Sequence, residues 1–464
     1  MGHIVLLPGI ERFPLVDRLV AALRQRCHRV SILALDPVAA TFWQQQDPNV
    51  IVVPAADATD TTDTAVVAAG NGAGEGDGAL ADLFAHRPLA ERRELTARLP
   101  ALQAWLAVER PHLVLLLDER DAASGMVAFA ARAAGCRVLW AGSGLLPHTL
   151  QIDDRGLDGE ASCAQRSAGD FRVVRNDLAL LEAALANALA RTQPFRLPTR
   201  RPNRPTWRAC VHAALAVLRN QGLGRALQAY RTLRTIHHRF GNEPELGAEP
   251  NRERPPTTAL PNRPFLAVLL QSPSDPRLVH DADSPPDPAT LVAAACDAAK
   301  ALDRDCVVVV VRADERTRLP AGCRDCSVVP ASMAIDAAAV AAAVVTINHP
   351  LASIALLAGT PVLHLGRALY GVRGVAVRTT LASLPKDLAE AVAHDHPTLR
   401  QRFLSWVFEH GHVWCSSTQP AHNGTLGLVQ AIEARLQLPP AQLPPLHHVK
   451  GPGWPLSVTK SPNG

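Results

Sequence analysis

Short apolar runs alternate with amphipathic segments from the first residues of the chain onward. Residues 2–7 form one such run and residues 29–34 another, and both are typical of buried strands. The intervening residues 13–26 place apolar side chains at helical spacing. These apolar positions are Leu15, Leu19, Val20 and Leu23. The pattern therefore predicts a strand, a helix and a strand, which is the opening unit of an α/β fold.

The same alternation continues through both halves of the chain. Further strands are predicted at residues 113–117, 137–140, 265–270, 306–311, 327–330, 344–347 and 361–365. Further helices are predicted at residues 288–302, 335–343, 351–358, 397–408 and 425–438. The chain has 464 residues, which is long enough for two domains of ordinary size. We expect the second α/β unit to begin at residue 265.

Net charge, apolar runs and cysteine content limit the classes of protein to which this chain can belong. The formal net charge is only +4, so we expect no nucleic-acid partner. No run of eighteen apolar residues could span a membrane, and the opening residues lack the pattern of a secretory signal. The nine cysteines are scattered, which favours reduced thiols and a cytoplasmic location. Cys323 and Cys326 form an isolated pair, so we expect no metal site.

Two segments depart from the α/β pattern. Residues 55–78 are rich in Ala, Thr, Asp and Gly and predict a surface loop. Residues 194–254 contain twelve arginines and four glutamates, interleaved with Trp207, Tyr230 and Phe240. This composition favours an arginine- and proline-rich connector. The alternative is a segment that binds an anionic inner-membrane surface.

Residues 344–374 hold the most informative pattern. Val344 to Ile347 is a β-branched run typical of a buried strand, and the polar pair Asn348 and His349 ends it. Pro350 follows, where its fixed φ suits the first turn of a helix. A helix N-terminus at the carboxyl end of a strand presents free N–H groups and the positive end of its dipole. The corner therefore predicts a phosphate-binding site.

The run from Thr346 to Gly374 also has a specific spacing, which reads TIN-x6-AL-x2-G-x-PV-x2-LG-x-A-x-Y-x3-G. It resembles the donor-side signature of the bacterial capsule polysaccharide Kdo transferases, the KpsS/KpsC-like proteins of the capsule biosynthesis and export family. The resemblance implies transfer of Kdo, or a related acidic sugar, from a CMP-sugar to a lipid or saccharide acceptor. The family usually has small hydroxyl residues where this chain has His349 and Pro350.

The resemblance further implies a GT-B-like α/β fold, in which two Rossmann-like domains face each other across a cleft and C-terminal helices return to the first domain. The expected parts are an N-terminal acceptor domain (1–190), an Arg/Pro-rich connector (191–260), a C-terminal nucleotide-sugar donor domain (261–390), C-terminal helices (391–438) and a flexible tail (439–464).

Asp275 is the residue for which the resemblance implies catalysis. It ends the run QSPSD, which begins at Gln271 directly after the strand predicted at residues 265–270. Taken alone, an aspartate after Ser-Pro is typical of a turn or a helix cap. In the similar family, this aspartate is implicated as the catalytic nucleophile. A carboxylate nucleophile divides one displacement into two and so retains the anomeric configuration.

The resemblance also implies which residues bind each substrate. The donor-side residues are Gln271, Arg312, Asn348, His349, Ser353, Gly366, Arg367 and Tyr370. The acceptor-side residues are Gly9, Asp118, Arg120 and Asp153. Arg312 stands where the family has a Lys-x-His-Pro run, and His349 is a candidate replacement for the missing imidazole. Leu146 stands where the family has an arginine.

Apart from the CMP-sugar substrate, we expect no cofactor. The expected partners are the nucleotide sugar, the acceptor, an anionic inner-membrane surface and capsule assembly proteins. The departures from the family pattern leave open a catalytically impaired capsule partner of the same fold. A nucleotide-sugar epimerase of similar architecture is a third alternative, which ranks lower because the run from Gly366 to Gly374 is not its pattern.

Overall fold

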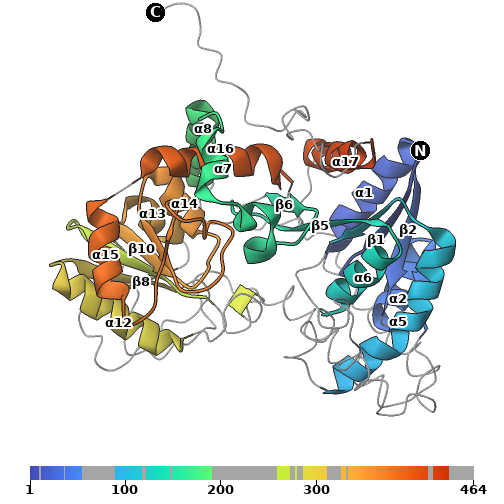
Figure 1. The fold of residues 1–464 in the computed structure, drawn as a ribbon, viewed down its shortest axis with the longest axis horizontal. Coiled ribbons are helices and arrows are strands. Elements are labelled where there is room, and N and C mark those ends of the chain that lie inside the picture. The colour runs from blue at the N-terminus through green and yellow to red at the C-terminus, as the bar shows by residue number, and fades with distance from the viewer. Residues whose placement is uncertain are drawn as a thin grey trace, which may run out of the picture.

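The chain folds into two α/β domains, seen as separate lobes in the computed structural model (Figure 1). The structure describes residues 1–9, 12–35, 37–54, 89–117, 122–146, 149–190, 259–271, 277–278, 286–310, 326–330, 333–394, 396–415 and 422–437. Within these ranges, no helix combines the length and the apolar character needed to cross a membrane.

The first domain is built on a sheet with the strand order β13-β6-β5-β4-β1-β2-β3. Its strands are β1 (His3–Leu7), β2 (Arg29–Ala34), β3 (Val50–Val52), β4 (Leu113–Leu116), β5 (Arg137–Ser143), β6 (Leu150–Asp153) and β13 (His412–Val413). β1 pairs in parallel with β2 and β4, whereas β6 runs antiparallel to β5 and β13 antiparallel to β6. Ile4 and Leu6 face one core and Val5 and Leu7 the other, so the sheet is buried on both faces.

Helices cover both faces of the first sheet. One face carries α1 (Phe13–Gln25), α2 (Pro37–Gln46) and α17 (His422–Gln437). The other face carries α5 (Leu89–Glu109) and α6 (Ala122–Ala133). The amphipathic pattern predicted for α1 is confirmed, because its four predicted apolar positions are all buried.

The second domain is built on a parallel sheet with the order β12-β11-β10-β7-β8-β9. Its strands are β7 (Phe265–Leu269), β8 (Asp305–Val310), β9 (Cys326–Pro330), β10 (Ala343–Thr346), β11 (Val362–His364) and β12 (Val377–Arg378). One face packs against α13 (Ala334–Val340), α14 (Ala352–Ala358) and α16 (Pro397–His410). The other packs against α12 (Pro288–Ala301) and α15 (Leu384–Ala393).

The two sheets share one topology. When the strands of each domain are numbered along the chain, the described sheets both contain the order 3-2-1-4-5-6, with β13 added at the edge of the first. This is the order of a Rossmann fold, whose ligands bind outside the carboxyl ends of the strands where the order reverses. The prediction of two Rossmann-like domains is therefore confirmed. Their switch points lie between β1 and β4 and between β7 and β10.

The chain changes domain earlier than expected. The predicted boundary at residue 190 assigns α7 (Ala168–Arg172) and α8 (Leu178–Ala190) to the first domain. In the structure, Phe171 of α7 and Leu181 of α8 belong to the core of the second domain. Phe171 packs edge-to-face on Phe403 of α16, with ring centroids 5.1 Å apart. Both helices lie with the second lobe in Figure 1.

The C-terminal part of the chain returns to the first domain, as predicted. α16 packs on the second domain, and β13 directly after it pairs with β6 of the first sheet. α17 then packs on α1, and its residues Leu428, Val429 and Ile432 are fully buried in the first core. The red α17 lies over the blue α1 in Figure 1. This return is the GT-B-like feature of the arrangement.

Several helices were not predicted from the sequence, namely α2, α5, α6, α7, α8 and α15. α6 is rich in alanine, so the contrast between its buried and exposed faces is weak. α5 has apolar residues spread around its axis and contains Pro100, which normally interrupts a helix. Tertiary packing supplies the stability that the local sequence of these helices does not show, and for α7 and α8 it comes from the helices α13, α14 and α16.

Two glycines of α17 test how closely this helix must approach β13. A Cβ at Gly424 would lie 2.6 Å from the backbone oxygen of Trp414, which cannot move aside, whereas one at Gly427 would meet only the Val413 side chain, at 3.2 Å. Gly424→Ala should therefore lower the free energy of unfolding by about 1–3 kcal/mol. Gly427→Ala should be neutral or stabilising, because alanine favours a helix by about 1 kcal/mol. Denaturation curves that coincide for the two variants would contradict this packing.

Candidate functional site

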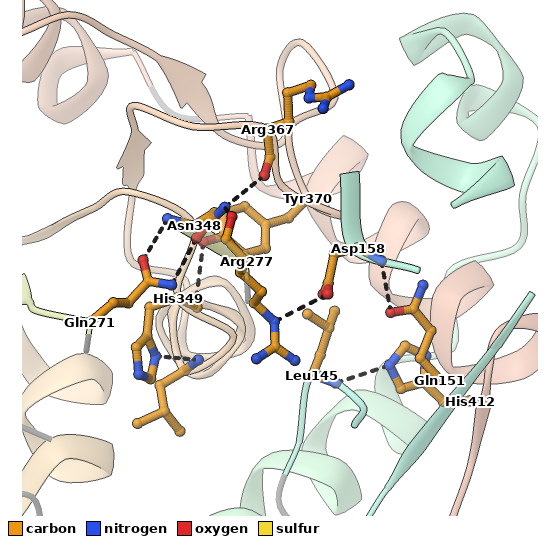
Figure 2. A network of polar contacts seen from close by, with 11 residues as sticks. Leu145, Gln151, Asp158, Gln271, Arg277, Asn348, His349, Arg367, Tyr370 and His412 are labelled. Atoms are coloured by element: carbon orange, nitrogen blue, oxygen red, sulfur yellow. Dashed lines mark hydrogen bonds and ion pairs between the residues drawn. The ribbon is translucent and has the colours of Figure 1, made fainter. Parts of the chain in front are cut away.

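A buried pair of side-chain amides joins the two strands at the switch point of the second sheet. Gln271 follows β7 and Asn348 follows β10. The Nε2 of Gln271 donates to Oδ1 of Asn348 at 2.7 Å, and the backbone N–H of Asn348 donates to Oε1 of Gln271 at 3.0 Å (Figure 2). The two residues are 5% and 4% exposed. The pair therefore fixes the two loops that leave the carboxyl ends of β7 and β10.

The remaining donor groups of Asn348 hold two arginine-bearing loops. Its Nδ2 donates to the backbone oxygen of Arg277 at 3.0 Å and to that of Arg367 at 3.2 Å. All the polar atoms of the Asn348 side chain thus have protein partners. Its place in this structure is that of a positioning residue, which ties the backbone at Arg277 and Arg367 to one point at the edge of the sheet.

His349 completes the polar corner before α14. The N–H of Leu351 donates to its Nδ1 at 3.0 Å, so the proton of the neutral ring sits on Nε2. Burial, and secondly the charge of Arg277, lowers the pKa of His349 to about 3. The imidazole is therefore neutral at physiological pH and carries an Nε2–H that can donate a hydrogen bond. An asparagine before a helix often caps its N-terminus, but the side chain of Asn348 bonds Gln271 instead.

The loop after β11 packs against this corner. The Tyr370 hydroxyl donates to the backbone oxygen of His349 at 2.9 Å. Burial, and secondly the nearby Asp158 carboxylate, raises the pKa of Tyr370 far above its usual value, so the phenol stays protonated. Nδ1 of His364 lies 2.7 Å from the backbone oxygen of Gly366, and burial lowers the pKa of His364 to about 4. Its neutral ring therefore donates to Gly366 and holds the loop in place.

Loops of the first domain contact the corner directly, and we call the contact the interdomain seam. The Ser353 hydroxyl of α14 donates to the backbone oxygen of Leu145 at 2.8 Å. The N–H of Leu145 donates to Nε2 of His412 at 3.0 Å, while Nδ1 of His412 lies 3.2 Å from the Val407 oxygen. Leu145 therefore links the second domain to the returning strand β13.

Two ion pairs cross the same seam. Nε of Arg277 lies 3.1 Å from Oδ2 of Asp158, and the two side chains are 12% and 14% exposed (Figure 2). Nη1 of Arg367 lies 3.0 Å from Oε1 of Glu160, and these side chains are 43% and 50% exposed. Both carboxylates belong to one short turn, η2 (Asp158–Glu160), which we call the acidic turn. Two guanidinium groups at one sheet edge can bind two anionic groups of a ligand.

Asp153, predicted on the acceptor side, organises the loop that carries the acidic turn. Its carboxylate accepts hydrogen bonds from the backbone N–H groups of Arg155 at 2.8 Å, Gly156 at 3.2 Å and Ser162 at 3.0 Å. The Ser162 hydroxyl donates a further bond at 2.6 Å. Asp153 is 7% exposed. In this structure its carboxylate is therefore engaged with the protein.

The other predicted site residues fall into two groups. Gly9 follows β1, and its oxygen accepts the N–H of Arg12 at the start of α1. Asp118, Arg120, Asp275 and Arg312 lie outside the described residues. Within the described ranges, no group of His, Cys, Asp and Glu side chains is arranged to hold a metal ion.

Two hollows of the described surface lie at the amino ends of strands in the first sheet. One, of about 640 Å³, is bounded by Arg110, His112 and Arg137, which precede or begin β4 and β5. A smaller one, of about 270 Å³, lies beside β2 and β3. Both are at the amino ends of these strands, so neither belongs to the seam.

The sequence pattern did not single out Arg277, Asp158, Glu160 or His412. The sequence did contain a signal that could have identified Arg277 as a site residue. It is a cation two residues after Asp275, in the loop that leaves β7. Asp158 and Glu160 lay in the predicted acceptor-side segment, but nothing local distinguishes them from solvated acids. His412 is far from the rest of the seam in sequence.

Comparisons with family profiles and with curated proteins found no match. Among solved structures, the glycotransferase of kitacinnamycin is similar at 15% identity and a TM-score of 0.33, covering 94% of this chain and 99% of that one. The calicheamicin glycosyltransferase is similar at 14% identity and 0.35, covering 94% and 98%. The UDP-GlcNAc 2-epimerase from Neisseria meningitidis bound to UDP-GlcNAc is similar at 10% identity and 0.32, covering 87% and 98%.

The amide pair is expected to behave as one energetic unit. Gln271→Leu and Asn348→Ala each leave buried polar atoms without partners, so each should lower the free energy of unfolding by about 1–3 kcal/mol. The double variant removes both side-chain amides and should lose at least about 1 kcal/mol less than the sum. Urea denaturation of the four proteins measures this coupling.

Thr360 provides the matched control for that cycle. Its buried hydroxyl donates to the Ala341 oxygen at 3.3 Å, away from the amide pair. Thr360→Val combined with Asn348→Ala should therefore be additive. Additive losses for Gln271 and Asn348 as well would mean that the pair is not a unit.

His412 makes stability depend on pH. Burial lowers its pKa to about 4 in the folded protein, against about 6.5 in the unfolded chain. Between these values the unfolded chain binds a proton that the folded protein does not. The stability present above about pH 6.5 is therefore lost as the pH falls toward 4. His412→Gln keeps a donor and an acceptor but cannot be protonated, so the slope of unfolding free energy against pH should fall by up to about 1.4 kcal/mol per unit.

Urea denaturation at pH 7, 6 and 5 measures this slope. His394 is exposed and is the control, because His394→Gln changes a side chain that stays in water on folding. A slope for His412→Gln equal to that of the parent and of the control would show that His412 does not carry the effect.

Proposed function

We propose that the protein is a glycosyltransferase of capsular polysaccharide biosynthesis, which transfers Kdo or a related acidic sugar from a CMP-sugar to a lipid or saccharide acceptor. The observation that carries the proposal is that Asn348 holds the backbone of Arg277 and Arg367 at the switch point of the second sheet, with both guanidinium groups in reach of one short turn. Nucleotide sugars are the class of ligand that such a pair suits, because they carry anionic groups.

The charges of a CMP-linked acidic sugar match this arrangement. Such a donor has one negative charge on its phosphodiester and one on the sugar carboxylate. A guanidinium binds either group through two parallel hydrogen bonds. The Nε2–H of neutral His349 supplies a further donor beside Arg277 without adding charge. The spacing of the run from Thr346 to Gly374 supports CMP-Kdo over other donors, through its resemblance to the Kdo transferases.

Asp275 is the proposed nucleophile. It lies two residues before Arg277, in the segment that leaves β7. Its carboxylate attacks the anomeric carbon and the bond to the CMP phosphate breaks, so the departing CMP retains the bonding electron pair. A hydroxyl of the acceptor, bound on the first domain, then displaces the carboxylate and gives up its proton to solvent. Two inversions give overall retention.

The second candidate function is a catalytically impaired capsule partner of the same fold. One observation favours it, namely that Asp158 and Glu160 already neutralise both arginines. In either role, the arginine-rich residues 194–254 are proposed to bring the protein to an anionic inner-membrane surface, beside capsule assembly proteins.

Replacement of Asp275 separates the two candidates. Asp275→Ala should reduce sugar transfer from CMP-Kdo far more than tenfold while CMP binding, measured by calorimetry, persists. Tenfold corresponds to only about 1.4 kcal/mol of barrier. Asp297→Ala, at an exposed position on α12, is the control and should keep the parent rate.

Two outcomes would contradict the proposed function. A parent protein that binds UDP but not CMP would exclude a CMP-sugar donor. A parent that binds CMP without transferring sugar would identify the impaired partner instead.

A further inference from the structure

We propose that the acidic turn, as it stands in this structure, occupies the donor's anion positions and must withdraw before the donor binds. The inference rests on the proposed function, since it takes Arg277 and Arg367 as the groups that receive the donor's negative charges. It adds an autoinhibitory contact, in which a segment of the first domain is the competing ligand.

The acidic turn contacts both cations at once. Asp158 and Glu160 are separated by Gly159 alone, and their carboxylates lie 3.1 Å from Arg277 and 3.0 Å from Arg367. For a guanidinium, a carboxylate and a phosphate oxygen are ligands of the same type. One short segment of the first domain therefore supplies the two negative charges that a CMP-linked acidic sugar would bring.

The shape of the acidic turn is fixed from its own domain. The Asp158 N–H donates to Oε1 of Gln151 on β6 at 3.2 Å, and its φ is +50°, a region that aspartate tolerates better than most residues. Leu157 packs against Gly142, where an added Cβ would lie 2.4 Å from Leu157 Cδ1. These contacts and those of Asp153 lie within the first domain, so they do not involve the arginines.

The donor and the acidic turn exclude one another. Arg277 and Asp158 are 12% and 14% exposed, so an anion that binds this guanidinium would meet the Asp158 carboxylate at close range in a poorly solvated place. Like charges repel strongly there. The Arg367–Glu160 pair is about half exposed, and such pairs contribute little to stability. A ligand can therefore displace the acidic turn first at Arg367, where the ion pair is exposed.

The first test compares CMP affinity by calorimetry in the full-length protein. The combined variant Asp158→Asn with Glu160→Gln removes both charges and keeps the side-chain shapes, and asparagine tolerates a positive φ. It should bind CMP roughly tenfold more tightly than the parent, within the usual range of such couplings. Asp303→Asn removes one carboxylate charge from a 96% exposed position and should bind like the parent. Unchanged or weaker binding by the combined variant would overturn the inference.

The second test measures amide hydrogen exchange in the parent with and without CMP. The N–H groups of Glu160 and Ala161 bond backbone oxygens within the turn. They should exchange faster when CMP displaces the turn from the arginines. Slower exchange would mean that the turn closes over the ligand, which contradicts the inference.

The two tests together separate this inference from the proposed function. If neither the parent nor the combined variant binds CMP, the proposed function is wrong and the inference fails with it. If the parent binds CMP while affinity and exchange are insensitive to the acidic turn, only the inference fails.

Discussion

The contact on which the carboxyl edge of the second sheet depends is the Gln271–Asn348 amide pair. It is buried between the carboxyl ends of β7 and β10, where water cannot replace a lost partner. A fully satisfied polar network in such a place is rigid, and a partly satisfied one is costly. Because Asn348 also bonds the backbone of Arg277 and Arg367, the position of the backbone at both arginines depends on this one pair.

The interdomain seam is assembled from both ends of the chain. Leu145 bonds Ser353 of the second domain through its oxygen and His412 of the returning strand through its N–H. α7 and α8 follow the first sheet directly in sequence but pack on the second domain. α17 follows the second sheet in sequence but packs on the first domain. The relative placement of the two sheets therefore depends on the packing of α7 and α8 on the second domain and of α17 on the first.

The interdomain seam combines buried side chains that stay neutral with two arginine–carboxylate ion pairs. Burial keeps His349, His412 and Tyr370 uncharged at physiological pH, so they serve as hydrogen-bonding groups. Among the described residues, the charges near the amide pair include those of Arg277 and Arg367 and of the acidic turn that meets them. An anionic ligand of Arg277 and Arg367 would therefore compete with these carboxylates for the same guanidinium groups.

The sequence by itself determined the α/β class, two domains, most strands and the polar corner at Asn348 and His349. These features are local, because periodicity and turn residues act over a few positions. The tertiary structure decided that Asn348 faces Gln271, 77 residues away, and that Leu145 meets His412, 267 residues away. It also assigned α7 and α8 to the second core. A short polar segment carries no local mark of its partner, so such pairings are fixed only when packing excludes water and leaves each buried group one place to bond.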